Sequence, residues 1–204
     1  MSSNSKKIKS LIYSDTFHLF LILLMIFLTR FGYWNLIYVG STDEITYLLA
    51  GREFLNGLVP YRDFYEIKPP VAFLPYALAN IFENEILAIR IFGFISITFC
   101  TYLLFKQSSK ITSIFVAKII ALTFVLLNSE FLFQASGLTI FIYPFLLLIS
   151  NILIFKKENY LNYFIVGLCV SMICLIRPNF YPLVFGIILI FYLFSQNKIK
   201  SILF

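Results

Sequence analysis

The chain has 204 residues, of which 60% are hydrophobic and 13% are charged, and its formal net charge at pH 7 is +6. Soluble domains carry about 25% charged residues, so this composition, with a mean hydropathy of +0.90, excludes an ordinary soluble domain and indicates a polytopic membrane protein. The cations do not form a basic face interleaved with aromatic residues, which argues against nucleic acid as a partner.

Six apolar segments predict six transmembrane helices in one all-α membrane domain, because about 20 residues cross a hydrocarbon core. They cover residues 16–38, 86–105, 111–127, 138–155, 161–176 and 180–194. With a cytoplasmic N-terminus, the lysine clusters at residues 6–9, 106–110, 156–157 and 198–200 all fall inside, as the positive-inside rule requires. The first segment is longer than the apolar part of a cleaved signal peptide, so we expect an uncleaved anchor.

The three cysteines, Cys100, Cys169 and Cys174, lie within apolar segments and imply neither a disulfide nor a metal framework. His18 is the single histidine, which leaves no second histidine for a metal pair. No P-loop, dinucleotide-binding fingerprint or Gly-x-Ser-x-Gly motif is present. Soluble nucleotide chemistry is therefore unsupported.

Residues 39–85 form the one long connection, and long ordered connections in compact domains are usually functional. Ser41 to Glu44 matches a helix capping box, apolar residues follow at helical spacing, and Asn56-Gly57 is a stop signal. This pattern predicts a helix along the outer membrane surface.

After Gly57 the sequence up to Lys68 lacks a sustained period and predicts an irregular segment. Pro69-Pro70 then starts a second interfacial helix over residues 71–82. Pro75 should kink that helix or start it again after one turn.

The charged residues of this connection have two interpretations. Asp43 and Glu44 are either first-turn acids that complement a helix dipole or catalytic carboxylates. Glu66 and Lys68 are either a solvated turn or a fixed pair in which two prolines hold the lysine. Neither alternative is settled by spacing.

Three cations lie in or near apolar segments, where ionisable groups are costly and become functional candidates. Lys118 can extend to the cytoplasmic surface, and Arg90 lies close to the outer one. Arg30 sits in the outer half of the first segment, where it either reaches the surface or binds an anionic headgroup.

Three short stretches in this order resemble the N-terminal part of GT-C membrane glycosyltransferases, the group that includes lipid A aminoarabinose transferases and protein O-mannosyltransferases. They are Asp43-Glu44 with Tyr47, then Gly57-Leu-Val-Pro-Tyr-Arg-Asp, then Phe64-Tyr-Glu-Ile-Lys-Pro-Pro70. The likeness covers about 30 residues.

The resemblance implies an inverting enzyme of a bacterial inner membrane that transfers a sugar from a polyprenyl-phosphate donor to a glycan, lipid or protein hydroxyl in the cell envelope. It assigns Asp43 as general base, with Glu44 beside it as the second catalytic candidate. It assigns Lys68 to the departing phosphate, Tyr47 to donor or acceptor, and Glu66 to the orientation of Lys68. The sequence indicates no metal site, and the resemblance leaves a divalent cation open.

Two features depart from this family. Aminoarabinose transferases tend to carry an arginine before the tyrosine that matches Tyr47, whereas this chain has Thr46. Arg52 or Arg62 is the candidate substitute for that second phosphate contact, and Arg30 is a further substrate-binding candidate. The relatives are about twice as long, so we expect a missing C-terminal half or a partner subunit, and no transfer by this chain alone. The alternative is a non-catalytic membrane partner or small transporter that binds an anionic lipid.

Overall fold

The computed structural model describes residues 15–29, 42–128, 137–155 and 159–194. This part of the chain consists of eight α-helices and two short 3-10 helices, and it contains no β-strand. The predicted all-α class is confirmed. It follows from long apolar runs whose backbone polar groups are satisfied within each helix.

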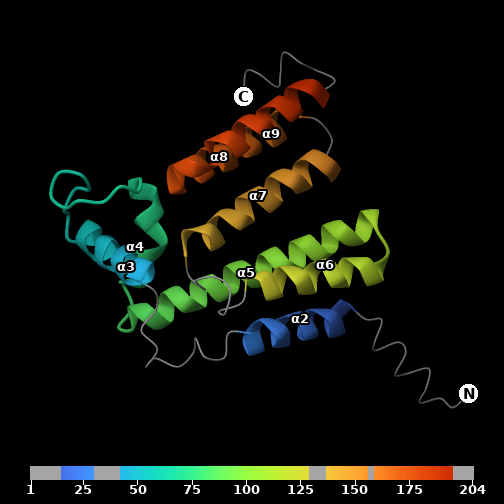
Figure 1. The fold of residues 1–204 in the computed structure, drawn as a ribbon, viewed down its shortest axis with the longest axis horizontal. Helices are drawn as coiled ribbons and strands as arrows, with labels where there is room; N and C mark the ends of the chain where they lie inside the picture. Colours follow the sequence, from blue (N-terminus) through green and yellow to red (C-terminus); the bar gives the residue numbers. More distant parts are fainter. Residues whose placement is uncertain (1–14, 30–41, 129–136, 156–158, 195–204) are drawn as a thin grey trace, which may run out of the picture.

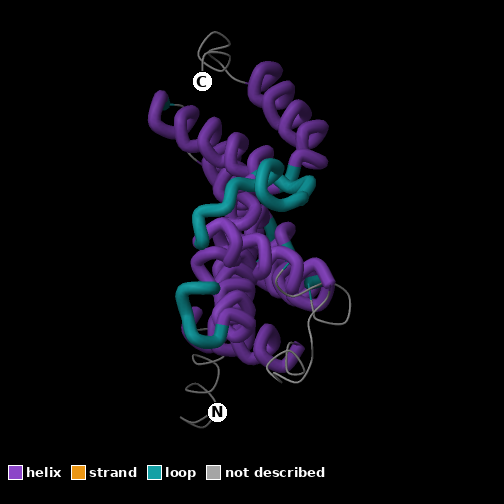
Figure 2. The backbone as a smooth tube through the Cα atoms, turned by 90° about the vertical axis from the view of Figure 1, so that its left-hand side faces the viewer, coloured by secondary structure: helices purple, strands orange, loops and turns teal. Residues whose placement is uncertain are grey.

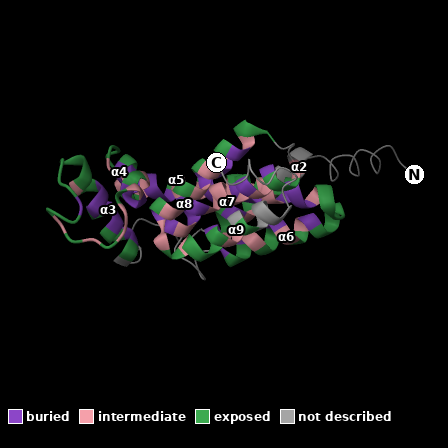
Figure 3. Ribbon diagram, turned by 90° about the horizontal axis from the view of Figure 1, so that it is seen from above, coloured by how far each residue is buried: buried purple, intermediate pink, exposed green. Residues whose placement is uncertain are grey.

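Six helices form a bundle in which α5 lies at the centre (Figure 1). They are α2 (Asp15–Thr29), α5 (Glu85–Ile111), α6 (Ile114–Leu127), α7 (Leu138–Phe155), α8 (Tyr160–Ile176) and α9 (Tyr181–Phe194). Helix α5 contacts α2, α6 and α7, while α8 packs against the other side of α7 and also contacts α9. Figure 3 shows that exposed residues follow the outward faces of the bundle helices.

The six predicted apolar segments are helical where the structure describes them, except at Thr112 and Ser113, which separate α5 from α6. The lengths of the helices differ. Helices α5 and α7 have 27 and 18 residues, and an 18-residue stretch of each has a mean hydropathy of 1.9 and 2.3, respectively, so both are long and apolar enough to cross a membrane. A rise of 1.5 Å per residue gives α5 a length of roughly 40 Å. Helices α2, α6, α8 and α9 have between 14 and 17 residues each. Residues 30–38 of the first predicted span lie outside the described part.

A proline inside α7 is accommodated by a hydrogen bond from α5. Pro144 has no N–H, so the carbonyl of Ile140, four residues earlier, loses its partner within the helix. The Ser96 hydroxyl donates to that carbonyl oxygen at 2.7 Å. Farther along, the Gln107 amide donates to the Leu147 carbonyl at 2.9 Å. These bonds fix α5 against α7 in an otherwise apolar interface.

Three shorter elements cover one end of the bundle, where α5 and α7 begin and α8 ends (Figure 1). They are α3 (Thr42–Leu55), the 3-10 helix η2 (Pro70–Phe73) and α4 (Leu74–Ala79). Helix α3 contacts η2 and α4, η2 contacts α8, and α4 contacts α5. Figure 2 looks onto this end and shows the irregular connections in teal.

The predicted stop of α3 is confirmed. Its last residue is Leu55, Gly57 has a φ of +84°, and the Leu58 N–H returns to the Glu53 carbonyl at 3.1 Å. Glycine adopts this left-handed conformation without strain, which is why it ends the helix. Ser41 of the predicted capping box lies outside the described residues.

The predicted helix over residues 71–82 is divided and shorter. Pro75 lies in the first turn of α4, directly after the single turn of η2, as predicted. Helix α4 ends at Ala79 because the side-chain amide of Asn80 donates to the carbonyls of Tyr76 and Leu48, at 2.8 and 2.9 Å. That amide therefore also joins α4 to α3.

Candidate functional site

Tyr47 lies at the centre of the polar end of the bundle. Its side chain is buried, and its ring lies 5.3 Å from Tyr76 and 6.4 Å from Phe73, measured between ring centroids. Tyr76 in turn meets Phe141 of α7 edge-on at 6.0 Å. The aromatic contacts thus fix the face of α3 that carries Tyr47 against α4 and η2, and they join α4 to α7.

Burial and three charged side chains shift the pKa of the Tyr47 phenol. Burial raises its pKa above the ordinary 10.0, the carboxylates of Asp43 and Glu66 raise it further, and the Arg177 guanidinium opposes them. The phenol therefore stays a neutral hydroxyl at physiological pH. Helix η2 contacts both α3 and α8, so these three segments meet at the same end of the bundle.

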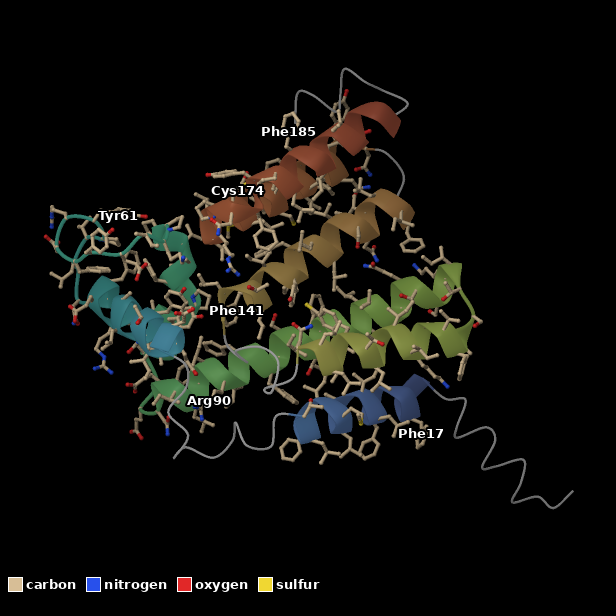
Figure 4. All side chains as sticks on the ribbon, in the orientation of Figure 1. Phe17, Tyr61, Arg90, Phe141, Cys174 and Phe185 are labelled. Atoms are coloured by element: carbon tan, nitrogen blue, oxygen red, sulfur yellow. The ribbon has the colours of Figure 1, made fainter. Side chains whose placement is uncertain are left out.

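Asp43 and Glu44 have opposite environments although they are neighbours on α3. Asp43 is exposed at the end of the molecule. Glu44 is buried, and its Oε1 atom lies 3.6 Å from Nε of the fully buried Arg90. Figure 4 shows Arg90 on α5 at the same end of the molecule as Tyr61. The Glu44–Arg90 ion pair therefore anchors α3 to α5 and leaves Asp43 on the accessible side.

Glu66 fixes the backbone of Lys68. Its Oε1 atom accepts hydrogen bonds from the N–H groups of Ile67 and Lys68, at 2.8 and 3.3 Å. The Tyr61 hydroxyl donates to the Lys68 carbonyl at 2.6 Å. Both the N–H and the carbonyl of Lys68 are therefore hydrogen-bonded, so its backbone is fixed before Pro69. The Lys68 side chain is half-buried.

Arg62 and Arg52, two of the candidate phosphate contacts, are engaged elsewhere. Arg62 is paired with Asp63 at 2.7 Å, and this guanidinium, together with the Val59 N–H, lowers the pKa of the Asp63 carboxyl. Arg52 reaches Glu85 at 2.5 Å and so joins α3 to the first residue of α5. Arg30, the third candidate, lies outside the described residues.

Arg177 is the site residue that the sequence analysis did not select. It ends α8, its N–H donates to the Ile173 carbonyl at 2.9 Å, and its guanidinium donates to the hydroxyl of Thr139 on α7. One sequence signal was available. Arg177 precedes Pro178 at the outer end of a predicted span, just as Lys68 precedes Pro69.

The structure thus brings the segments that carry Asp43, Glu66 and Arg177 to one end of the bundle, where their charges act on Tyr47, and it fixes the backbone N–H of Lys68 on the Glu66 carboxylate. None of the three ion pairs found in the described part of the chain joins Asp43 to Lys68. Among the same residues, no three His, Cys, Asp or Glu side chains lie close enough together to hold a metal ion. The site combines an accessible carboxylate, a neutral phenol, the Arg177 guanidinium and the fixed backbone of Lys68.

Comparison with known proteins finds no match: no family model, no curated protein and no solved structure is similar to the chain. The function is therefore argued from the site.

Proposed function

We propose that the chain is the N-terminal part of a GT-C membrane glycosyltransferase, which transfers a sugar from a polyprenyl-phosphate donor to a hydroxyl at the extracytoplasmic face. One observation carries the proposal. Tyr47, packed on Phe73 and Tyr76 at one end of the bundle, lies within the electrostatic influence of Asp43, Glu66 and Arg177, which come from three separate segments. The backbone N–H of Lys68 is hydrogen-bonded to Glu66 at the same end.

Asp43 is the general base in this proposal. A sugar hydroxyl is a poor nucleophile near neutral pH, and a positioned base contributes about 10²–10⁴ to the rate. Glu44 is buried against Arg90, so Asp43 is the carboxylate of the adjacent pair that an acceptor can reach. Glu44 contributes by holding α3, and with it Asp43, in place.

Lys68 and Arg177 are the cations for the donor phosphate. Negative charge grows on the departing lipid phosphate, and fixed cations in a partly water-excluded site stabilise it. Arg177 supplies the second contact that Thr46 cannot, and its planar guanidinium suits phosphate oxygens. Its hydrogen bond to Thr139 positions it at the junction of α7 and α8.

The membrane location is supported by the surface of the bundle. Large apolar side chains are exposed on several helices, including Phe20, Phe99, Phe164 and Phe185. Such extensive apolar exposure is rare in soluble monomers. The six-span topology fits the arrangement at the site, because alternating spans put the starts of α5 and α7 and the end of α8 on one side of the bilayer.

Donor binding tests the proposal directly. The purified chain is reconstituted in nanodiscs, and native mass spectrometry measures retention of undecaprenyl phosphate against uncharged undecaprenol. We expect retention of the phosphate to fall about tenfold or more in Lys68→Ala and in Arg177→Ala, since a hydrogen bond to a charged group is worth about 1.5–3 kcal/mol. Lys106→Ala is the matched control, because Lys106 is an exposed lysine near the opposite end of α5.

Equal retention of phosphate and alcohol, or equal loss in the Lys106 control, would overturn the donor assignment. The alternative of a non-catalytic lipid-binding partner also predicts binding. It differs in predicting no transfer when the chain is combined with the C-terminal part or partner that completes it.

A further inference from the structure

A cavity lies away from the candidate site, between α2, α5 and α6. Its volume is about 310 Å³, at the lower end of the ~300–1,000 Å³ typical of ligand pockets. Its apolar walls are formed by Leu21, Ile22, Met25, Phe105, Ala121, Leu122 and Val125. Leu21 and Leu122 are exposed, so the cavity opens to the surface of the bundle.

Lys118 is the charged residue among those that line the cavity. It lies one turn inside α6, about 6 Å from the start of the helix at a rise of 1.5 Å per residue. Its side chain is partly exposed, and none of the three ion pairs in the described part of the chain includes it. An amine on a lipid-facing helix needs an anionic or polar partner.

No acidic residue accompanies Lys118 on α6 or on the adjoining turns of α5. The sequence from residue 86 to residue 128 contains no Asp or Glu, while Lys106 and Lys110 lie on the last turns of α5, before the connection to α6. On α2 the acid is Asp15, its first residue, well before Leu21. This end of the cavity is therefore complementary to an anion.

We infer that the cavity is a binding site for an anionic glycerophospholipid of the cytoplasmic leaflet. One acyl chain lies between α2 and α6 against Phe105, and the headgroup phosphate pairs with Lys118. The apolar walls suit a hydrocarbon chain, and the single cation at the opening suits one phosphate. A zwitterionic headgroup fits less well, because none of the residues that line the cavity carries a carboxylate to pair with its ammonium group.

This inference goes beyond the proposed transferase. It uses the proposed membrane topology only to assign the lipid to the cytoplasmic leaflet. Simple extension of Lys118 to the membrane surface accounts for the amine but not for a cavity of this size beside it. The lipid accounts for both. Binding here secures α2 to the α5–α6 pair through a ligand, away from the sugar-transfer site.

Lipid retention tests the inference. The full chain is purified from mixed vesicles of phosphatidylglycerol and phosphatidylethanolamine, and retained lipid is quantified by mass spectrometry. We expect preferential retention of phosphatidylglycerol and a loss of about fivefold in Lys118→Gln, the effect of one lysine near an anionic headgroup. Leu122→Trp, at the exposed mouth of the cavity, should displace the lipid without removing charge.

Lys106→Gln is the control, because it removes a lysine from the same region outside the cavity. Equal losses in Lys106→Gln and Lys118→Gln would show nonspecific surface attraction and overturn the site. Equal retention of both lipids, or unchanged retention in Leu122→Trp, would overturn it as well. Lys68→Ala should leave phosphatidylglycerol retention unchanged, which separates this result from failure of the proposed donor site.

Discussion

Asp43 and Glu44 are adjacent in the sequence, yet the fold gives them different tasks. Successive residues on a helix point about 100° apart, so one carboxylate turns to the surface while the other turns toward Arg90 of α5. Both residues carry a carboxylate, and only their positions on α3 give them different environments. The exposed carboxylate is suited to accept a proton, whereas the buried one is suited to hold α3.

If the proposed transferase function holds, Asp43→Asn should abolish sugar transfer, because the amide keeps the shape but cannot accept a proton. Donor retention should stay within about twofold of wild type, since the phosphate cations are unchanged. Radiolabelled transfer and lipid retention measure the two effects. Near-normal turnover of this variant would return Asp43 to the role of a first-turn acid that complements the helix dipole.

Arg177 should behave as a phosphate contact with its own geometric requirement. Arg177→Ala should weaken both donor binding and turnover, because the phosphate is already charged in the ground state. Arg177→Lys should recover part of the binding, since an ammonium group keeps the charge but loses the planar fork. Retention of undecaprenyl phosphate by the two variants tests this prediction. Unchanged retention in Arg177→Ala would remove Arg177 from the site.

At the scale of elements, the site depends on how closely α3 approaches α4. A Cβ on Gly51 would lie 2.6 Å from the Ala77 backbone nitrogen, which is closer than atoms normally pack. The two helices are further joined by Asn80, whose amide donates to the Leu48 carbonyl. Small size at Gly51 is therefore required for the position of Asp43 and Tyr47.

Gly51→Ala should destabilise the protein by about 1–3 kcal/mol, because the added methyl group forces α3 and α4 apart. Gly186→Ala on α9 is the control, since a Cβ there meets no atom within 4 Å. That control should be neutral or slightly stabilising. Reversible unfolding in mixed micelles measures both, and equal effects would contradict the close helix contact.

The Glu44–Arg90 pair gives a second element-scale prediction. Arg90→Met should cost about 3–5 kcal/mol, because it leaves the Glu44 carboxylate buried opposite an apolar group. Adding Glu44→Leu should restore most of that loss, since two apolar residues of similar volume can replace a buried ion pair. A double variant as unstable as Arg90→Met would show that the two side chains are not coupled.

At the scale of the whole molecule, the topology can be tested with two exposed positions. Asn56 follows α3, and Thr112 lies between α5 and α6 at the opposite end of the bundle. In a background without the native cysteines, Asn56→Cys should react with an impermeant maleimide from outside intact cells. Thr112→Cys should react only after permeabilisation. Labelling of both from the same side would remove the assignment of the site to the outer face.

The helical architecture was predictable because it depends on patterns among neighbouring residues. Apolar runs placed the six bundle helices to within a few residues at most described ends, and Gly57 and Pro75 marked where α3 ends and α4 begins. The lengths of the short helices were less predictable. Asn80 ends α4 through a contact with Leu48, which lies 32 positions earlier in the sequence.

The candidate site was partly predictable for the same reason. Asp43, Tyr47, Glu66 and Lys68 were selected because the short stretches that carry them resemble those of a known family of membrane glycosyltransferases. The sequence could not show that Glu44 is buried against Arg90, or that Arg62 is engaged by Asp63. Burial and pairing depend on which elements pack together.

By itself the sequence determined that this is an apolar, all-helical protein with one polar connection rich in charged residues, because helix formation and hydrophobicity act over a few neighbouring residues. The tertiary structure alone decided that Arg177, more than 100 positions after Tyr47, lies near the same phenol. It also decided that Lys118 borders a cavity rather than a closed interface. Both results depend on contacts between distant helices, which are set by side-chain packing and have no local signature.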